Sequence, residues 1–365
     1  MKLELTQEKL SKALSIVSRI ASSKSGLPIL NNILLRTDGS KLVVLSTNLE
    51  IAIVEYLNVK IIKPGSITIP AKLLNEFISN LPKTTVVLEA KNGHLHVSAG
   101  NYKSTINGID SDEFPELPIL DEKTATTFEI DVDSFKESVP QVVVAASGDT
   151  TRPALTGVFL NTNNKTLCLA ATDGYRLAEK KLIEKAGYEL SAIVPAASLQ
   201  EVIRSIGDDT SKIEVLFDDN QIRFRFDDIE ITSKIIDARF PDYRQLIPKH
   251  TDVNVVINKE ELLRVSKLAA LFARESGGSI IIEAISKDNT VSIKSVASEL
   301  GENDSSLDAK VDGDGKVTLN SRFLIDALNN IPDEDIHFGF SGKLAPVVIK
   351  SNASGYTHII MPLKS

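Results

Sequence analysis

The stretch Gly65-Ser-Ile-Thr-Ile-Pro70 returns in altered form as Leu190-Ser-Ala-Ile-Val-Pro195 and as Gly315-Lys-Val-Thr-Leu-Asn320. From residue 70 to 195, and again from 195 to 320, the spacing is 125 residues. A second stretch, Leu5-Thr-Gln-Glu-Lys-Leu10, returns on nearly the same period at Ile130 and at Ile257. A period this long is a whole domain and not a short solenoid repeat. The chain of 365 residues is therefore predicted to hold three domains, 1–122, 123–249 and 250–365, and three copies of one domain suggest an arc or ring.

Each repeat carries the same order of elements. A strand leads into a first helix, whose apolar residues in the first repeat (Leu10, Ala13, Leu14, Val17, Ile20) follow the spacing of a one-sided helix over 7–20. In the third repeat this helix is expected to begin after Asn258, as a capping box with Glu261, and to run to about Phe272. Second helices are expected over 71–81, 196–206 and 321–331, where Pro70, Pro195 and the capping residue Asn320 suit a helix start.

Between the helices, short segments alternate apolar and polar residues or form brief apolar runs, and turn signals such as Asn92-Gly93 separate them. These segments predict strands. The fold class that follows is α+β, with two helices packed on a mostly antiparallel sheet in each of three tandem domains.

Composition limits the cellular compartment and the class of protein that can be expected. Its single cysteine, Cys168, lies in an apolar segment that reads as a buried strand, and a single cysteine permits no internal disulfide. The N-terminus does not resemble a signal peptide and no apolar run reaches the length of a membrane span, so a cytoplasmic protein is expected. The net charge of −8, taken over the whole chain, argues against a nucleic-acid-binding protein, but it is compatible with one basic surface on an otherwise acidic protein.

Motifs for catalysis or for a cofactor are missing from the sequence. There is no phosphate-binding loop, no dinucleotide fingerprint, no H-E-x-x-H and no C-x-x-C. His94 and His96 share one face of an expected strand without a third metal ligand, so a solvated strand face is favoured over a metal site. Asp312-Gly-Asp-Gly-Lys316 lacks the later ligands of a calcium loop and reads as a hairpin turn. We expect no catalytic residue, no metal and no cofactor.

Five segments in order resemble the bacterial DNA polymerase III β subunits, the sliding clamps. The similarity covers the whole chain, with its triple repeat, and is carried by Leu27-Pro-Ile-Leu-Asn-Asn32, Arg152-Pro-Ala-Leu-Thr-Gly157, Ala171-Thr-Asp-Gly-Tyr-Arg-Leu177, Asp237-Ala-Arg-Phe-Pro-Asp-Tyr-Arg244 and His358-Ile-Ile-Met-Pro-Leu363. The resemblance implies a head-to-tail homodimer of three clamp domains per chain, a ring that encircles duplex DNA without reading its sequence. It implies a non-catalytic processivity factor that tethers the DNA polymerase III α subunit and is loaded onto DNA by a clamp loader. Other polymerases and repair proteins are expected to bind it through short linear motifs.

The resemblance also implies a pocket for partner peptides between the second and third domains. Most of its positions are apolar, as an anchor pocket requires, and the apolar tail of the chain is expected to lie along something rather than fray. The residues are Leu155, Thr172, Gly174, Tyr175, Arg176, Leu177, Pro241, Leu246, Asn320, Pro346, Ile359, Ile360, Met361, Pro362 and Leu363.

DNA-facing positions are expected on the helices, where Lys and Arg accompany the apolar stripe and can contact phosphates without reading bases. They are Lys12, Arg19, Lys72, Arg204, Arg264 and Lys267, joined by Lys24 and Arg152 through the resemblance. Ring closure is expected to place Leu271 and Phe272 against the edge strand around Lys103 and Ile106 of a second copy.

Two other functions remain open at the level of sequence. One is a hydrolase-like enzyme that uses Asp173 as a base and Arg176 as an anion clamp in an interdomain cleft, although no nucleophile is recognisable beside them. The other is a repeat scaffold that does not bind DNA.

Overall fold

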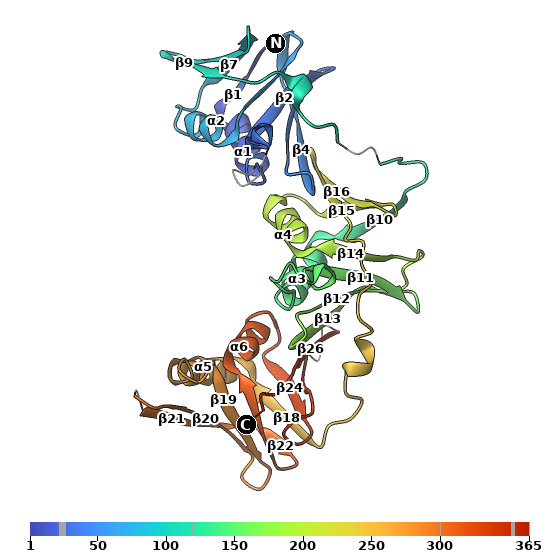
Figure 1. Ribbon diagram of the computed structural model, residues 1–365, viewed down its shortest axis with the longest axis vertical. Helices are drawn as coiled ribbons and strands as arrows, with labels where there is room; N and C mark the ends of the chain where they lie inside the picture. The colour runs from blue at the N-terminus through green and yellow to red at the C-terminus, as the bar shows by residue number, and fades with distance from the viewer. Residues whose placement is uncertain (22–26, 118–119, 300, 352–354, 365) are drawn as a thin grey trace. The chain divides into compact units, whose positions relative to one another are not determined.

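The computed structural model describes residues 1–21, 27–117, 120–299, 301–351 and 355–364. Within these ranges the same order of elements occurs three times, with a strand and a helix, a run of strands, a second helix and three further strands (Figure 1). The first repeat comprises β1 (Lys2–Thr6), α1 (Gln7–Val17), η1 (Pro28–Asn31), β2 (Asn32–Asp38), β3 (Lys41–Thr47), β4 (Ile51–Asn58), β5 (Lys60–Lys63), β6 (Ser66–Pro70), α2 (Ala71–Ser79), β7 (Thr85–Lys91), β8 (His94–Ala99), β9 (Tyr102–Asn107) and η2 (Ser111–Glu113).

The second and third repeats follow the same plan. The second comprises β10 (Thr126–Asp131), α3 (Val132–Val143), η3 (Pro153–Leu155), β11 (Gly157–Asn163), β12 (Thr166–Thr172), β13 (Arg176–Ile183), β14 (Ser191–Pro195), α4 (Ala196–Ser205), β15 (Lys212–Phe217), β16 (Gln221–Phe226), β17 (Ile229–Lys234) and η4 (Arg244–Leu246). The third comprises β18 (Val253–Asn258), α5 (Lys259–Phe272), β19 (Ser279–Ile285), β20 (Thr290–Ala297), β21 (Gly301–Asp308), β22 (Lys310–Asp312), β23 (Gly315–Asn320), α6 (Ser321–Asn329), β24 (Asp335–Phe340), β25 (Val347–Ser351) and β26 (Tyr356–Ile360).

Helix starts agree with the sequence, whereas several helix ends fall earlier. Asn258 and Asn320 both cap, because their side chains accept from the backbone N–H groups of Glu261 and Arg322. The helix expected over 7–20 ends at Val17, and the second helices end at Ser79, Ser205 and Asn329, one or two residues before the expected 81, 206 and 331. At Asn80 and Asn330 the physical reason is visible, since each side-chain amide donates 2.8 Å to a carbonyl of the last turn and stops the helix there.

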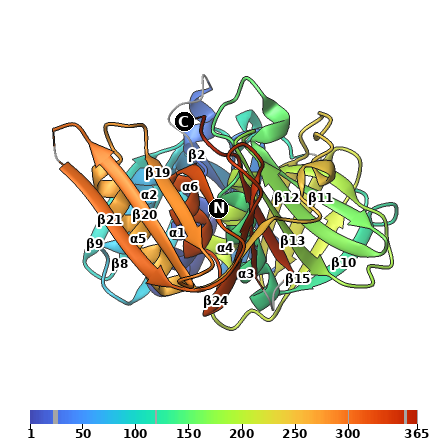
Figure 2. The same cartoon turned by 90° about the horizontal axis from the view of Figure 1, so that it is seen from below.

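The strands form sheets in which every pairing between described strands is antiparallel, which confirms the α+β class. Two sheets, of strand order β5-β1-β7-β8-β9 and β21-β20-β19-β23, belong to the first and third repeats alone. Figure 2 shows the strands β19, β20 and β21 side by side. Burial alternates along β19 and β20, as expected for a sheet with one covered face.

The middle repeat divides its strands between two larger sheets. One has the order β10-β15-β16-β17-β4-β3-β2-β6, and the other β14-β11-β12-β13-β26-β25-β24-β18-β22. The chain accordingly forms two compact units, Met1–Val132 with Glu201–Ile235, and Asp133–Gln200 with Ile236–Ser365. These units follow the shared sheets, whereas the domain boundaries 1–122, 123–249 and 250–365 follow the sequence period and stay predictions.

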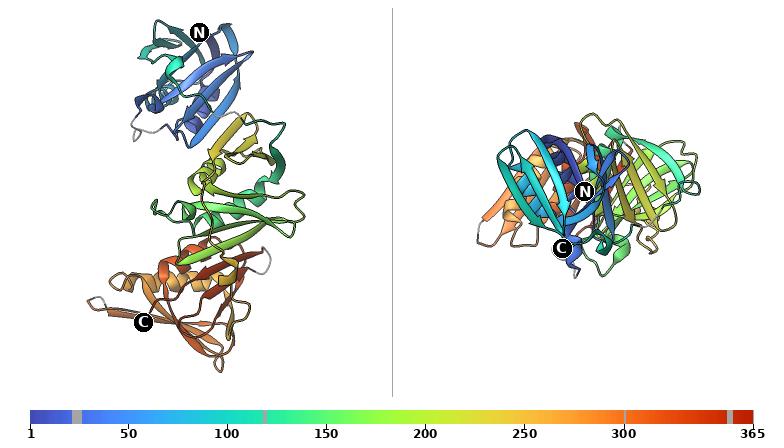
Figure 3. Two further views of the ribbon diagram at one scale, coloured as in Figure 1. Left: turned by 45° about the vertical axis from the view of Figure 1, so that its right-hand side comes forward. Right: turned by 90° about the horizontal axis from the view of Figure 1, so that it is seen from above.

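In the first and third repeats the core lies between the helices and the strands they pack against. In α1 the apolar stripe is buried as expected, with Leu10, Ala13, Leu14 and Val17 fully covered. Helix α1 packs against α2 and strands β3 and β4 (Figures 1 and 3), and α5 packs against α6, β20 and β21. Each buried Leu stabilises this core by about 2 kcal/mol. Cys168 is buried in β12 as expected, and burial raises the pKa of its thiol.

Candidate functional site

A tight turn joins β12 to β13 and carries the most distinctive segment of the sequence. The hydroxyl of Thr172 donates 2.6 Å to the carbonyl of Arg176 and accepts from the N–H of Gly174 at 3.1 Å. One carboxylate oxygen of Asp173 accepts from the N–H groups of Tyr175 and Arg176, at 2.8 and 2.9 Å. Gly174 has φ +91°, a conformation that favours glycine, and Tyr175 is left 64% exposed at the tip.

The C-terminal tail is attached to this turn and to strand β23. Strand β26 pairs with β13, with Arg176 opposite Ile360 and Leu177 opposite Ile359. Beyond the strand, the N–H of Met361 donates 2.8 Å to the carbonyl of Tyr175, and the N–H of Leu363 donates 2.8 Å to the carbonyl of Thr318 on β23. The expectation that the tail lies along other elements is therefore confirmed.

Arg176 joins the turn to helix α6. Its guanidinium is 3.0 Å from Asp173 and 2.7 Å from Asp326, and it lies over the ring of Phe323, 4.6 Å from its centroid. The Arg176 side chain is only 9% exposed. Asp173 and Arg176 thus neutralise each other and build the turn, which gives both residues a structural role and no support to the hydrolase alternative. Phe323 and Asp326 were not predicted from the sequence, because nothing near them in the chain points to residue 176.

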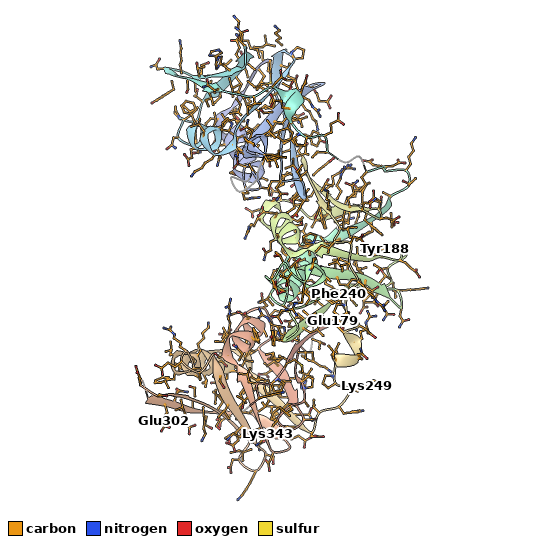
Figure 4. All side chains as sticks on the ribbon, viewed as in Figure 1. Glu179, Tyr188, Phe240, Lys249, Glu302 and Lys343 are labelled. Carbon is orange, nitrogen blue, oxygen red and sulfur yellow. The ribbon has the colours of Figure 1, made fainter. Side chains whose placement is uncertain are left out.

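The floor beneath the turn is a cluster of apolar side chains. Leu177 and Ile359 are buried in it together with Ala170, Ile193, Phe240, Tyr243 and Val348. Tyr243 contacts both Phe240 and Glu179, which are labelled in Figure 4. Its ring lies edge to face with the ring of Phe240, with 6.0 Å between the centroids, and its hydroxyl donates to Glu179. Burial and this hydrogen bond raise the pKa of Tyr243.

The residues expected in the peptide pocket divide into a buried and an exposed group. Thr172, Arg176, Leu177, Ile359 and Ile360 are buried in the fold, so they support the site from below. The others reach the surface fully or in part, and they are Leu155, Gly174, Tyr175, Pro241, Leu246, Asn320, Pro346, Met361, Pro362 and Leu363. Among these, Met361 is 37% and Leu246 49% exposed, as apolar contacts for a ligand require.

A buried polar pair on β26 was missed in the sequence. The hydroxyl of Tyr356 lies 2.8 Å from Nδ1 of His358 and 3.1 Å from the carbonyl of Gln141 on α3. His358 has no exposed surface, and its Nε2 has no partner among the described residues. Burial, and then the charge of Arg176, lower the pKa of His358 to about 3, so the ring is neutral. An alternating strand pattern places His358 inward, but only the tertiary structure shows what surrounds it.

The cations expected to face DNA lie on helices or beside them, in two electrostatic settings. Lys12, Lys72, Arg264 and Lys267 are exposed on α1, α2 and α5. Arg19 and Arg204 are instead held by Glu201, at 3.0 and 2.7 Å. Arg152 is exposed beside η3, near Asp149, and Lys24 lies outside the described residues.

Two sheet edges carry exposed apolar residues. Strand β9 is the last strand of its sheet, and β21 is the last strand of another. Lys103 and Tyr102 on β9 are exposed, whereas Ile106 is buried in its own repeat. Near β21, Leu268 and Leu271 on α5 and Val296 on β20 are 46, 49 and 60% exposed, and Phe272 is half-buried.

Within the described residues, no group of three or more His, Cys, Asp or Glu side chains could hold a metal ion. His94 and His96 instead bond across the sheet to Asn107 and Thr105. None of the described helices has the length and hydrophobicity that a bilayer crossing requires.

Comparison with known proteins gives a consistent result over the whole chain. Sequence profiles of the DNA polymerase III beta subunit match in three parts, the N-terminal domain at residues 1–118, the central domain at 129–242 and the C-terminal domain at 244–364. The beta sliding clamp of Synechococcus elongatus is 31% identical, over 100% of this chain and 99% of the relative. The crystal structure of the DNA polymerase sliding clamp from Bacillus subtilis superposes with a TM-score of 0.95 at 26% identity, over 100% of this chain and 99% of that one. The DNA polymerase III beta subunit from Thermotoga maritima superposes with a TM-score of 0.92 at 27% identity, again over 100% and 99%.

Proposed function

Because the chain belongs to the DNA polymerase III β subunit family, the β sliding clamps, we propose that two copies form a head-to-tail ring that slides on duplex DNA. In this ring each chain contributes three clamp domains, divided near residues 122 and 249. The protein is a non-catalytic cytoplasmic subunit, a processivity factor that needs no metal or cofactor. Its role is to keep a polymerase at the DNA between successive additions.

The observation that carries this proposal is the attachment of the tail to the β12–β13 turn. Hydrogen bonds fix Met361 to Tyr175 and Leu363 to Thr318 on β23, and the Met361 side chain stays exposed on this support. Such a surface suits a short linear peptide with apolar anchors. The partners proposed for it are the DNA polymerase III α subunit, the clamp loader, and other polymerases and repair proteins.

Ring closure is proposed to pair the edge of β9 in one copy with the edge of β21 in the other. An unpaired edge strand offers a row of N–H and C=O groups to a second chain, and a contact between two different surfaces can close into a ring. Leu271 and Phe272 would then be covered by the region of Lys103. Ile106 would contribute through its backbone, because its side chain is already buried in its own repeat.

DNA contact is proposed to use the exposed cations of the helices, Lys12, Lys72, Arg264 and Lys267, with Lys24 and Arg152 from neighbouring loops. Contacts to phosphates carry no sequence information and weaken with salt, so they allow movement along the duplex. Arg19 and Arg204 are weaker candidates, since they share the single carboxylate of Glu201, which leaves a net charge of +1 on the three side chains.

Retention on circular DNA tests the proposal. With a clamp loader and ATP, the protein should stay on a nicked circular plasmid through gel filtration and should leave when the plasmid is cut to a linear form. A scaffold that does not bind DNA would show no retention on either form.

A further inference from the structure

The β12–β13 turn has a counterpart in the first repeat, 125 residues earlier. The hydroxyl of Thr47 donates to the carbonyl of Ile51 at 2.9 Å and accepts from the N–H of Leu49 at 3.0 Å. The amide oxygen of Asn48 accepts from the N–H groups of Glu50 and Ile51, at 3.0 and 2.8 Å. Each of these bonds repeats one made by Thr172 or Asp173, and Leu49 has a positive φ of 73° where Gly174 has 91°.

The surroundings of the first turn repeat as well. Strand β17 pairs with β4, with Ile51 opposite Ser233, in the register by which β26 pairs with β13. Beyond the strand, the N–H of Lys234 donates 2.9 Å to the carbonyl of Glu50, as Met361 does to Tyr175. Phe114 is buried below the turn with Leu117 packed beside it, in the places that Phe240 and Tyr243 take below the second turn.

A cavity opens beside this first turn. It measures about 110 Å³ and is lined by Leu49, Ala52, Pro115 and Leu117, with Glu50, Glu116 and Lys234 among its other lining residues. All of these residues belong to one compact unit. The volume is below that of a whole drug-sized ligand site and suits a single aliphatic side chain.

The rim of the cavity carries charged side chains at two positions where the second turn has neutral ones. Glu50, Glu116 and Lys234 occupy the positions that are equivalent to Tyr175, Asp242 and Met361 at the second turn. Glu50, Glu116 and Lys234 are all exposed, and no ion pair joins any of them to another described residue. The three side chains sum to −1, as their counterparts at the second turn do, but Glu50 and Glu116 place two carboxylates at the recess where the second turn has only Asp242.

We propose that this cavity is a second peptide-binding site, which takes a short linear segment with one aliphatic anchor next to Lys or Arg. The anchor fills the recess, and the cation lies between Glu50 and Glu116. The proposal rests on the proposed function in one respect. It assumes that the β12–β13 turn is a peptide-binding site and that the equivalent turn between β3 and β4 is a modified copy of it. A clamp with two such sites per chain can hold two partners at once.

The test uses the full-length chain with methyl-labelled Leu, Ile and Met and two acetylated, amidated pentapeptides, Gly-Lys-Lys-Leu-Gly and Gly-Glu-Glu-Leu-Gly. NMR titration follows the methyl groups of Leu49 and Leu117 at the first turn and those of Leu177 and Met361 at the second. The lysine peptide should shift the first pair saturably and bind about fivefold to tenfold more tightly there than the glutamate peptide, as two exposed charges allow.

Charge reversal supplies matched variants. Glu50→Lys with Glu116→Lys should invert the peptide preference at the first turn, whereas Tyr175→Lys with Asp242→Lys, at the equivalent positions, should leave the first turn unchanged. The proposal is overturned if the lysine peptide moves Leu177 and Met361 but not Leu49 and Leu117, a result that leaves the proposed function intact. It is also overturned if the Leu49 methyls shift with protein concentration alone, since the occupant would then be a second copy. Saturable shifts at Leu49 with none at Met361 would instead support it, and the proposed pocket at the second turn is tested separately with its own polymerase peptide.

Discussion

The backbone N–H of Met361 lies 2.8 Å from the carbonyl oxygen of Tyr175, so the last residues of the chain are fixed to a turn almost two hundred positions earlier. This bond continues the pairing of β26 with β13 past the end of the strand. It holds the Met361 side chain at the surface, where an unattached C-terminal tail would fray. The proposed peptide pocket would thus depend on a backbone contact more than on any one side chain.

Truncation of the tail side chains should separate binding from assembly. In Met361→Ala with Leu363→Ala, binding of a peptide from the polymerase α subunit should weaken at least about tenfold, because apolar anchors carry most of the energy in such sites. Fluorescence anisotropy measures the affinity, and light scattering should give an unchanged mass. Equal affinity in the variant would place the pocket elsewhere.

Loss of Arg176 should cost much more stability than loss of a nearby exposed arginine. Arg176→Ala leaves Asp326 and Asp173 without their buried partner, and the free energy of unfolding should fall by about 3 kcal/mol. Arg322 reaches the same Asp326 carboxylate at 4.0 Å but is 82% exposed, so Arg322→Ala should cost less than about 1 kcal/mol. Urea unfolding of both variants checks this, and similar losses would refute the structural role of Arg176.

His358 should make the protein less stable in acid. Its pKa of about 3 lies below the usual 6.5, so below pH 6.5 the unfolded chain binds a proton that the folded chain does not. Stability is then lost as pH falls from 6.5 toward 3, by about 2–3 kcal/mol between pH 7 and pH 4.5. His358→Gln should reduce that loss in urea unfolding, and His337→Gln, at an exposed position, is the control. The same pH dependence in the wild type and in His358→Gln would contradict the prediction.

Glu55 should have the opposite pH dependence. Burial in β4 raises its pKa to about 7, so the folded chain keeps a proton that the unfolded chain releases above pH 4.5. Stability is lost as pH rises from 4.5 through 7, and Glu55→Gln should be more stable than the wild type by about 1–3 kcal/mol at pH 8 and no more stable at pH 4. Thermal unfolding at both pH values measures the difference. A variant that is less stable at pH 8 would show that the charged form is favoured.

Ring closure predicts a dimer that one charge can break. Phe272→Asp should convert a dimer to a monomer, because the carboxylate would be buried against the partner without a counter-charge. Light scattering after gel filtration gives the mass at micromolar concentration. A wild type that is already monomeric under these conditions would refute the proposed closure.

The fold was largely predictable because its signals are local. The apolar stripe of Leu10, Leu14 and Val17 and the caps Asn258 and Asn320 lie in short stretches of sequence, and the 125-residue period can be read directly by comparing such stretches. The helix ends were less predictable. Asn80 and Asn330 end their helices through side-chain hydrogen bonds to the backbone, and a periodic apolar pattern does not indicate such bonds.

The site was predictable in part. Family resemblance indicated Tyr175 and Met361, but not that Leu177 and Ile359 are buried below them. The roles of Phe323 and Asp326 depend on an arginine 150 positions away from Asp326, and no local pattern records such a contact. The division of the middle repeat between two large sheets is likewise a property of strand pairing over long range.

Two chains are proposed to enclose a duplex without gripping it, and loading on DNA tests this most directly. On nicked circular plasmid, with a clamp loader and ATP, the protein should co-elute with DNA, and cutting the plasmid once should release it within the time of the run. Protein that stays bound to the linear form, or that never co-elutes with the circle, would contradict the account.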